Sequence, residues 1–137
     1  KIKSKKMKSL INLVFVTVLV LLTSCATTAK FPVSSITPAA EITAKKKQDK
    51  NKNYVIEVTA KNLASANRVD PTKKNYSVWI VTENNGTKNA GMLVNKNAKT
   101  ASLKTSTPFD VKEIFITAED QGDYSYPVGI EIARTSF

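Results

Sequence analysis

The sequence predicts an all-β protein: an antiparallel β-sandwich of about seven or eight short strands, preceded by an N-terminal signal helix. Three observations favour this class. Apolar and polar residues alternate with a period of two in several segments, turn-forming residues recur about every 8–15 positions, and no helical period follows residue 24. A small β-barrel fits the same pattern and is the alternative architecture.

The first 24 residues have the parts of a secretory signal peptide. A basic segment without acids comes first, with lysines at positions 1, 3, 5, 6 and 8. An apolar run over residues 10–22 follows, and it is shorter than the roughly 20 residues that a membrane-spanning helix needs. We therefore expect residues 1–24 to be removed on export.

The apolar run ends in Leu22-Thr23-Ser24-Cys25, which fits the lipoprotein box Leu-(Ala/Ser/Thr/Val)-(Gly/Ala/Ser)-Cys. A diacylglyceryl group is attached through a thioether, so this chemistry needs the thiol of Cys25. We expect the signal peptidase to recognise Leu22, Thr23 and Ser24, and two or more acyl chains, such as palmitate, to anchor the protein. The alternatives are a plain signal peptide or an uncleaved anchor with a cysteine there by chance.

Residues 25–32 are expected to form a lipidated tether, because they show neither a helical nor an alternating pattern and end at Pro32. Ala26, and not an aspartate, follows Cys25. In lipoproteins of the enterobacterial type this favours sorting to the outer membrane. We therefore expect a lipid-anchored protein of the cell envelope, on the periplasmic or surface face of the outer membrane.

The remaining segment, residues 33–137, is long enough for one domain with one core. Five of the 21 basic residues lie in the signal, so removing it lowers the net charge from +10 to +5. Export and this modest charge argue against a nucleic-acid partner. With Cys25 acylated, no disulfide forms within one mature chain.

In the first half of the domain we expect short strands at residues 33–36, before Pro38, and at residues 41–45. A polar, lysine-rich turn over residues 45–52 follows. Residues 54–61 then alternate, which indicates a half-buried strand. Its inward-facing side chains are expected to be Tyr54, Ile56, Val58 and Ala60.

A loop over residues 62–74 leads to residues 76–82, which are apolar on both faces, as in a central strand. The turn Asn84-Asn85-Gly86-Thr87 joins this strand to a return arm over residues 90–94. We expect the last three strands at residues 99–104, 114–119 and 128–132.

From Tyr76 onward the chain contains Tyr76-Ser77-Val78-Trp79, Gly91, Ile116-Thr117-Ala118-Glu119, Gly122 and Pro127-Val128-Gly129. In these motifs it resembles the C-terminal extracytoplasmic domain of the anti-sigma-K factor family. The resemblance implies an immunoglobulin-like envelope domain. Ile130 replaces the family's last proline. The family's sigma-binding and transmembrane helices have no counterpart here, so sigma-factor binding is not implied.

The residue types argue against an enzyme, a metal site and a cofactor. The sequence has no histidine, and acylation would consume its only thiol, so the usual nucleophile–base pairs are missing. Zinc would lack its preferred ligands. Glu119, Asp120 and Asp123 surround Gly122, but they lack the spacing of a calcium loop and are better explained as a solvated turn.

Three groups of residues are candidates for contacts with a partner. Trp79 would stack on a sugar if exposed, but a tryptophan on a central strand is more often in the core. Tyr124 and Tyr126 flank Ser125 in a loop and are the better candidates for an exposed ligand contact. The lysines of residues 45–52 either belong to a solvated turn or contact anionic lipid headgroups or lipopolysaccharide.

The leading hypothesis is a non-catalytic, lipid-anchored module of the cell envelope that binds another protein or has a structural role. The second hypothesis is an accessory lipoprotein that binds a carbohydrate or small ligand. The third is a sensor domain linked to anti-sigma regulation, which depends on the resemblance alone. The expected partners are the membrane, through the lipid on Cys25, and an envelope protein or glycan.

Overall fold

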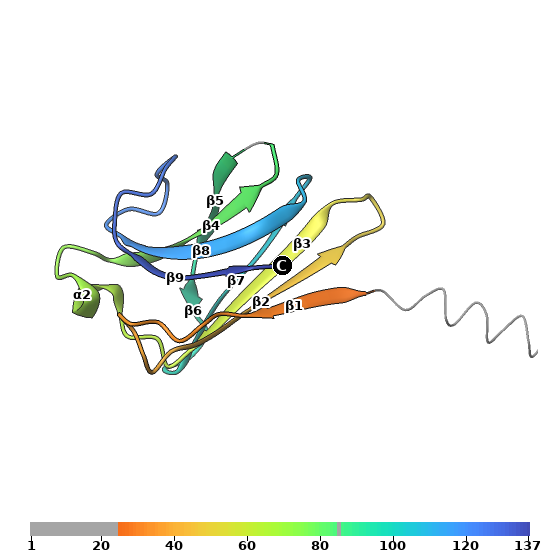
Figure 1. Ribbon diagram of the computed structural model, residues 1–137. Helices are drawn as coiled ribbons and strands as arrows, with labels where there is room; N and C mark the ends of the chain where they lie inside the picture. Colours follow the sequence, from red (N-terminus) through yellow and green to blue (C-terminus); the bar gives the residue numbers. More distant parts are fainter. Residues whose placement is uncertain (1–24, 85) are drawn as a thin grey trace, which may run out of the picture.

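The structure is a computed structural model and describes residues 25–84 and 86–137. The expected signal helix, with Leu22, Thr23 and Ser24, lies outside the described residues. The described part forms nine strands in two antiparallel sheets (Figure 1). The first sheet runs in the order β1 (Ala26–Lys30), β2 (Glu41–Gln48), β3 (Tyr54–Lys61), β7 (Thr100–Thr107) and β6 (Val94–Asn95). The second runs in the order β5 (Gly86–Met92), β4 (Asn75–Thr82), β8 (Val111–Glu119) and β9 (Glu131–Ser136).

The predicted β-sandwich is confirmed, and its strand order is that of an immunoglobulin fold. Strands β2, β3, β7 and β6 occupy the places of strands A, B, E and D in one sheet. Strands β4, β8 and β9 occupy those of C, F and G in the other, with β5 as an added edge strand. A short helix, α2 (Ala66–Val69), lies in the loop between β3 and β4.

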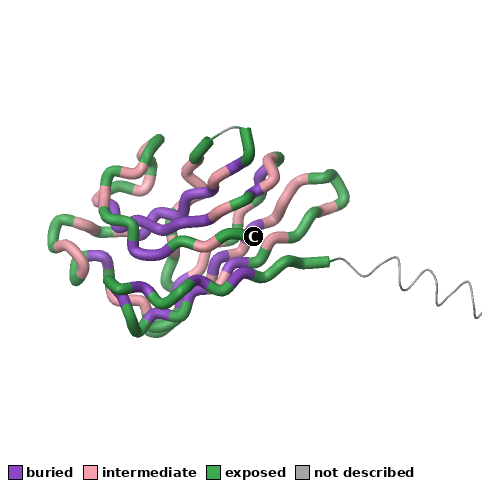
Figure 2. Tube along the Cα trace, viewed as in Figure 1, coloured by how far each residue is buried: buried purple, intermediate pink, exposed green. Residues whose placement is uncertain are grey.

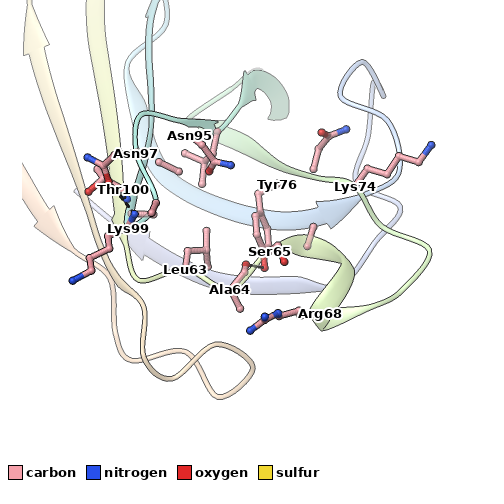
Figure 3. Close-up of a pocket in the computed structure, with 16 residues that line it drawn as sticks. Leu63, Ala64, Ser65, Arg68, Lys74, Tyr76, Asn95, Asn97, Lys99 and Thr100 are labelled. Atoms are coloured by element: carbon pink, nitrogen blue, oxygen red, sulfur yellow. Dashed lines mark hydrogen bonds between the residues drawn. The ribbon is translucent and has the colours of Figure 1, made fainter.

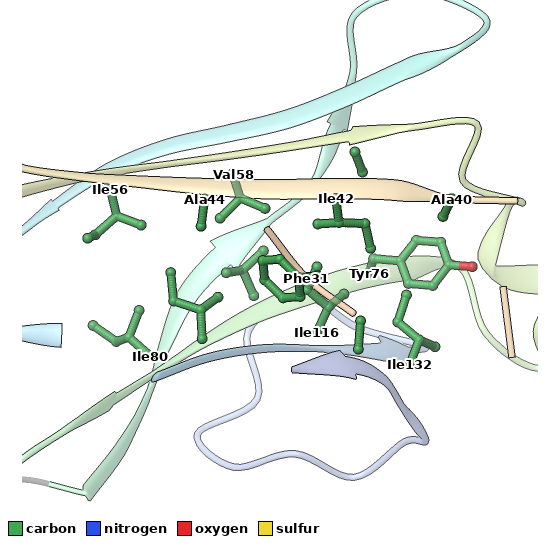
Figure 4. Packing of buried hydrophobic residues seen from close by; sticks show 14 of the residues in the cluster. Phe31, Ala40, Ile42, Ala44, Ile56, Val58, Tyr76, Ile80, Ile116 and Ile132 are labelled. Atoms are coloured by element: carbon green, nitrogen blue, oxygen red, sulfur yellow. The ribbon is translucent and has the colours of Figure 1, made fainter. Parts of the chain in front are cut away.

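The core lies between the two sheets, and Figure 2 shows buried stretches on strands of both sheets. Ile56, Val58 and Ala60 of β3 point inward, as their alternation predicts, and are almost fully buried. Figure 4 shows Ile56 and Val58, with Ile42 and Ala44 of β2, facing the apolar side chains of the second sheet. The second sheet contributes Tyr76, Val78, Ile80, Ile114, Ile116 and Ala118.

The expected tether is wrong for residues 26–30, which form the edge strand β1. This strand pairs with β2 along its whole length, from Ala26 opposite Lys47 to Lys30 opposite Thr43. Phe31, the next residue, is buried in the core. The apolar phenylalanine therefore holds the segment against the domain, although its sequence has no alternating pattern.

Two other expected strands are also corrected. Residues 33–36 are irregular and bend from residue 35, because the hydroxyl of Ser34 accepts hydrogen bonds from the amides of Ile36 and Thr37, at 3.1 and 3.0 Å, and competes with strand pairing. Residues 128–130 are a loop, and the last strand starts only at Glu131. The lysine-rich turn is shorter than expected, since β2 continues to Gln48.

Candidate functional site

Cys25 is exposed and directly precedes β1, at one end of the sandwich. The β1–β2 register places Ala26 opposite Lys47 and Thr28 opposite Lys45. In Figure 1 the β2–β3 turn lies at this same end, opposite α2. The predicted lipidation residue and the lysine-rich segment are therefore neighbours in space, although more than 20 positions separate them in the sequence.

The turn between β2 and β3 is held in one conformation by its own side chains. The carboxylate of Asp49 accepts hydrogen bonds from the amides of Asn51 and Asn53, both at 2.9 Å. Lys52 adopts a positive φ of 63°. Lys50 and Lys52 are thus presented on an ordered turn, with both side chains in solvent.

The side chain of Lys46 differs in direction from those of its neighbours, because it points toward the second sheet. Its ammonium group lies 2.9 Å from both a carboxylate oxygen of Asp110 and the carbonyl oxygen of Val111. Lys112 binds the other oxygen of Asp110, at 2.9 Å. These hydrogen bonds, first from Lys112 and then from Lys46, lower the pKa of Asp110.

A pocket with a volume of about 430 Å³ lies at the opposite end of the sandwich. The end of β3, the loop with α2, the start of β4 and the β6–β7 turn surround it. Figure 3 shows Tyr76 in the middle, with Lys99 on one side and Lys74 on the other. Its polar lining side chains are Ser65, Arg68, Lys74, Asn75, Tyr76, Asn95, Asn97, Lys99 and Thr100.

The pocket is positively charged, because its lining includes Arg68, Lys74 and Lys99 and no carboxylate. The long side chains of Lys74 and Lys99 extend outward at its rim (Figure 3). The phenol of Tyr76 donates a 2.6 Å hydrogen bond to the carbonyl oxygen of Ala64, which fixes the wall of the pocket. Burial raises the pKa of Tyr76 to about 12, so this donor keeps its proton at physiological pH.

The prediction that Trp79 is buried is confirmed, since none of its surface is exposed. It lies, however, on the outer face of the second sheet and not between the sheets, because its neighbours Val78 and Ile80 point into the core cluster. Its ring stacks on Phe115 at a centroid distance of 6.2 Å. Trp79 is therefore not available as a platform for a sugar.

The loop over residues 120–130 covers part of this outer face. The side-chain amide of Asn89 donates hydrogen bonds to the carbonyl oxygens of Gly122 and Tyr124, at 3.0 and 2.9 Å. The carboxylate of Glu119 accepts hydrogen bonds from the amides of Val128 and Gly129, at 3.2 and 2.8 Å. Side chains of β5 and β8 thus fix this loop against the outer face of the second sheet.

Tyr124 and Tyr126 both belong to this loop, and neither lines the cationic pocket. The phenol of Tyr124 donates a 2.8 Å hydrogen bond to Asp120, which lowers the pKa of that carboxyl group. Tyr126 is 70% exposed, and Val128 and Ile130 in the same loop are about half exposed. Tyr126 is thus accessible from solvent, whereas Tyr124 is held within the loop.

Across residues 25–84 and 86–137, no group of three or more acidic or cysteine side chains converges in a way that could hold a metal ion. In the same residues no helix is long and apolar enough to cross a membrane.

Comparisons with protein-family models, with curated proteins and with solved structures found no match to this chain. The resemblance to the anti-sigma-K family therefore stays a prediction from the sequence. Sequence reasoning also missed the cationic pocket. Its residues come from three separate segments, 60–68, 74–76 and 93–101, and none of them carries a motif of its own.

Proposed function

We propose that the protein is a non-catalytic lipoprotein of the cell envelope, anchored by acyl chains on Cys25 and acting as an interaction or structural module. The sequence box Leu22-Thr23-Ser24-Cys25 supports the anchor, and the exposure of Cys25 leaves its thiol accessible. The anchor places the protein on the outer membrane, facing the periplasm or the surroundings.

The observation that carries this proposal is the position of Cys25 relative to the rest of the domain. Cys25 lies at one end of the sandwich, while α2 and the pocket lie at the other (Figure 1). Strands β2 and β3 have eight residues each and connect the two ends, a span of about 26 Å. An anchor on Cys25 therefore leaves the far-end loops free to meet a partner.

Lipidation at Cys25 is the first testable prediction. Cells that express the full chain and grow with an alkyne analogue of palmitate are expected to label the protein, because the thioether-linked cysteine is the acceptor. The Cys25→Ser variant is expected to lose the label, whereas Ser24→Ala, which keeps the box, retains it. Labelling of Cys25→Ser at the level of the unaltered protein would refute the anchor.

A second candidate function is the binding of a small ligand or carbohydrate, and the pocket at the far end favours it. A volume of about 430 Å³ is in the range of small-molecule sites. The lining offers amide groups of Asn75, Asn95 and Asn97 for hydrogen bonds with hydroxyl groups. Because its charged residues are all cationic, an anionic sugar such as a uronic acid suits it better than a neutral one.

This second function is tested by nuclear magnetic resonance. The isotope-labelled protein is titrated with glucuronate and with glucose while amide chemical shifts are recorded. We expect shift changes with glucuronate that cluster at residues 63–68, 74–76 and 95–100. Arg68→Gln is expected to weaken the response several-fold, whereas Arg134→Gln, outside the pocket, leaves it unchanged. Equal responses to both sugars, or shifts elsewhere on the domain, would speak against an anionic ligand in this pocket.

A further inference from the structure

We propose that one end of the sandwich rests directly on the anionic headgroups of the membrane that holds the lipid anchor. We call this surface the basic end and define it by Lys45, Lys47, Lys50 and Lys52. The inference rests on the proposed anchor at Cys25 and adds to it an orientation, with the β2–β3 turn on the membrane and the pocket pointing away.

The first argument is the short length of chain between the anchor residue Cys25 and the first strand of the domain. Strand β1 starts at Ala26, one residue after Cys25, and is hydrogen-bonded to β2 from its first residue. One residue of extended chain spans about 3.3 Å. An acylated Cys25 therefore brings Lys47, the register partner of Ala26, to the level of the headgroups.

The second argument is the charge of this surface. None of the four lysines forms an ion pair in the part of the chain that the structure describes, and all four are exposed. Glu57 lies opposite Lys45 in the β2–β3 register and offsets part of its charge, but two other nearby carboxylates have partners of their own. Asp49 binds the backbone of the turn, and Asp110 is shared by Lys46 and Lys112. The basic end thus keeps an excess of positive charge for an external partner.

The third argument is that the basic end is preorganised. Asp49 fixes the turn that carries Lys50 and Lys52, so contact with a surface orders little additional backbone. A lysine close to an anionic lipid surface contributes about 1 kcal/mol, which corresponds to roughly fivefold in binding. Four such residues beside an acyl anchor are sufficient to fix the orientation of a small domain.

The test measures binding of residues 25–137 carrying Cys25→Ser to vesicles, without any acyl chain. Every member of the core cluster lies within this part of the chain, and cooperative melting of each variant checks its fold before binding is measured. Flotation with vesicles that contain one third phosphatidylglycerol is compared with flotation in pure phosphatidylcholine. We expect binding only to the anionic vesicles, with a loss of roughly fivefold for each of Lys45, Lys47, Lys50 and Lys52 replaced by glutamine.

The charge-matched control replaces Lys61, Lys73, Lys96 and Lys99 with glutamine. These residues lie at the far end, and their loss is expected to leave most of the binding intact. Equal losses in the two quadruple variants would show an effect of net charge alone and overturn the proposal, as would equal binding to neutral and anionic vesicles. Because this experiment needs no acylation, its result is independent of the palmitate labelling that tests the anchor.

Discussion

Replacing Trp79 with alanine is expected to destabilise the domain by about 3–5 kcal/mol, the usual cost of truncating a buried tryptophan. The indole is fully buried and stacks on Phe115. Its N–H donates a 2.8 Å hydrogen bond to the hydroxyl of Thr117, which would lose this donor. Because a small domain has about 5–15 kcal/mol of stability in total, we expect Trp79→Ala to unfold at much lower urea concentration or to be insoluble.

Trp79→Phe is the matched control, since it keeps a ring against Phe115 and removes only the hydrogen bond and part of the volume. We expect it to cost less than half as much as the alanine variant. The native protein has one tryptophan in all, so its fluorescence reports on this site. The emission should be blue-shifted and poorly quenched by acrylamide. Ready quenching, or wild-type stability of Trp79→Ala, would show that the residue is exposed.

Replacing Glu119 with alanine is expected to detach the loop over residues 120–130 and to cost about 2–5 kcal/mol. The carboxylate is completely buried and accepts hydrogen bonds from the Thr117 hydroxyl, at 2.6 Å, and from the amides of Val128 and Gly129. A buried polar group left without its partner costs about 1–3 kcal/mol, and this change leaves three such groups. Exposure of the detached loop to water limits the total cost.

Hydrogen exchange distinguishes this effect from general unfolding. We expect Glu119→Ala to accelerate exchange at Val128 and Gly129 far more than in the core strand β3. Glu113→Ala is the control, because that carboxylate on the same strand is 41% exposed and lies 3.5 Å from Arg134. Its removal should change stability by about 0.5 kcal/mol or less. Similar exchange profiles for the two variants would contradict the role given to Glu119.

The side chains in these two predictions belong to one continuous chain of hydrogen bonds. Trp79 donates to Thr117, Thr117 donates to Glu119, and Glu119 binds the loop backbone. Gly129 packs so closely that a Cβ atom built there would overlap the carbonyl oxygen of Ala118. Hydrogen bonds in such a chain strengthen one another, so the variants should be non-additive when combined.

Sequence patterns predicted the central strands well, because the pattern there is strong and local. The alternation in residues 54–61 and the apolar run in residues 76–82 correspond to β3 and β4. The patterns failed where one polar side chain binds backbone amides that a strand would use for pairing. Ser34 accepts hydrogen bonds from the amides of Ile36 and Thr37, and Glu119 accepts them from the amides of Val128 and Gly129, so these amides are not available for strand pairing.

For the candidate sites, the sequence supplied the lipoprotein box and Cys25, because a box of this kind consists of adjacent residues. The lipidation of Cys25 stays a prediction. It also supplied Tyr124 and Tyr126 as candidates without distinguishing them. The structure separated them, because the phenol of Tyr124 binds Asp120 while Tyr126 stays exposed. The pocket had no local signal, since its charge arises only when three distant segments meet.

The sequence by itself determined the all-β class and the positions of most strands, because side-chain alternation and turn residues act over a few neighbouring positions. Only the tertiary structure decided that Trp79 packs outside the sandwich and that the lysines of β2 lie beside Cys25. Both results depend on pairs far apart in the chain, such as Trp79 with Thr117 and Ala26 with Lys47. Such pairs follow from strand order and register, which no local pattern contains.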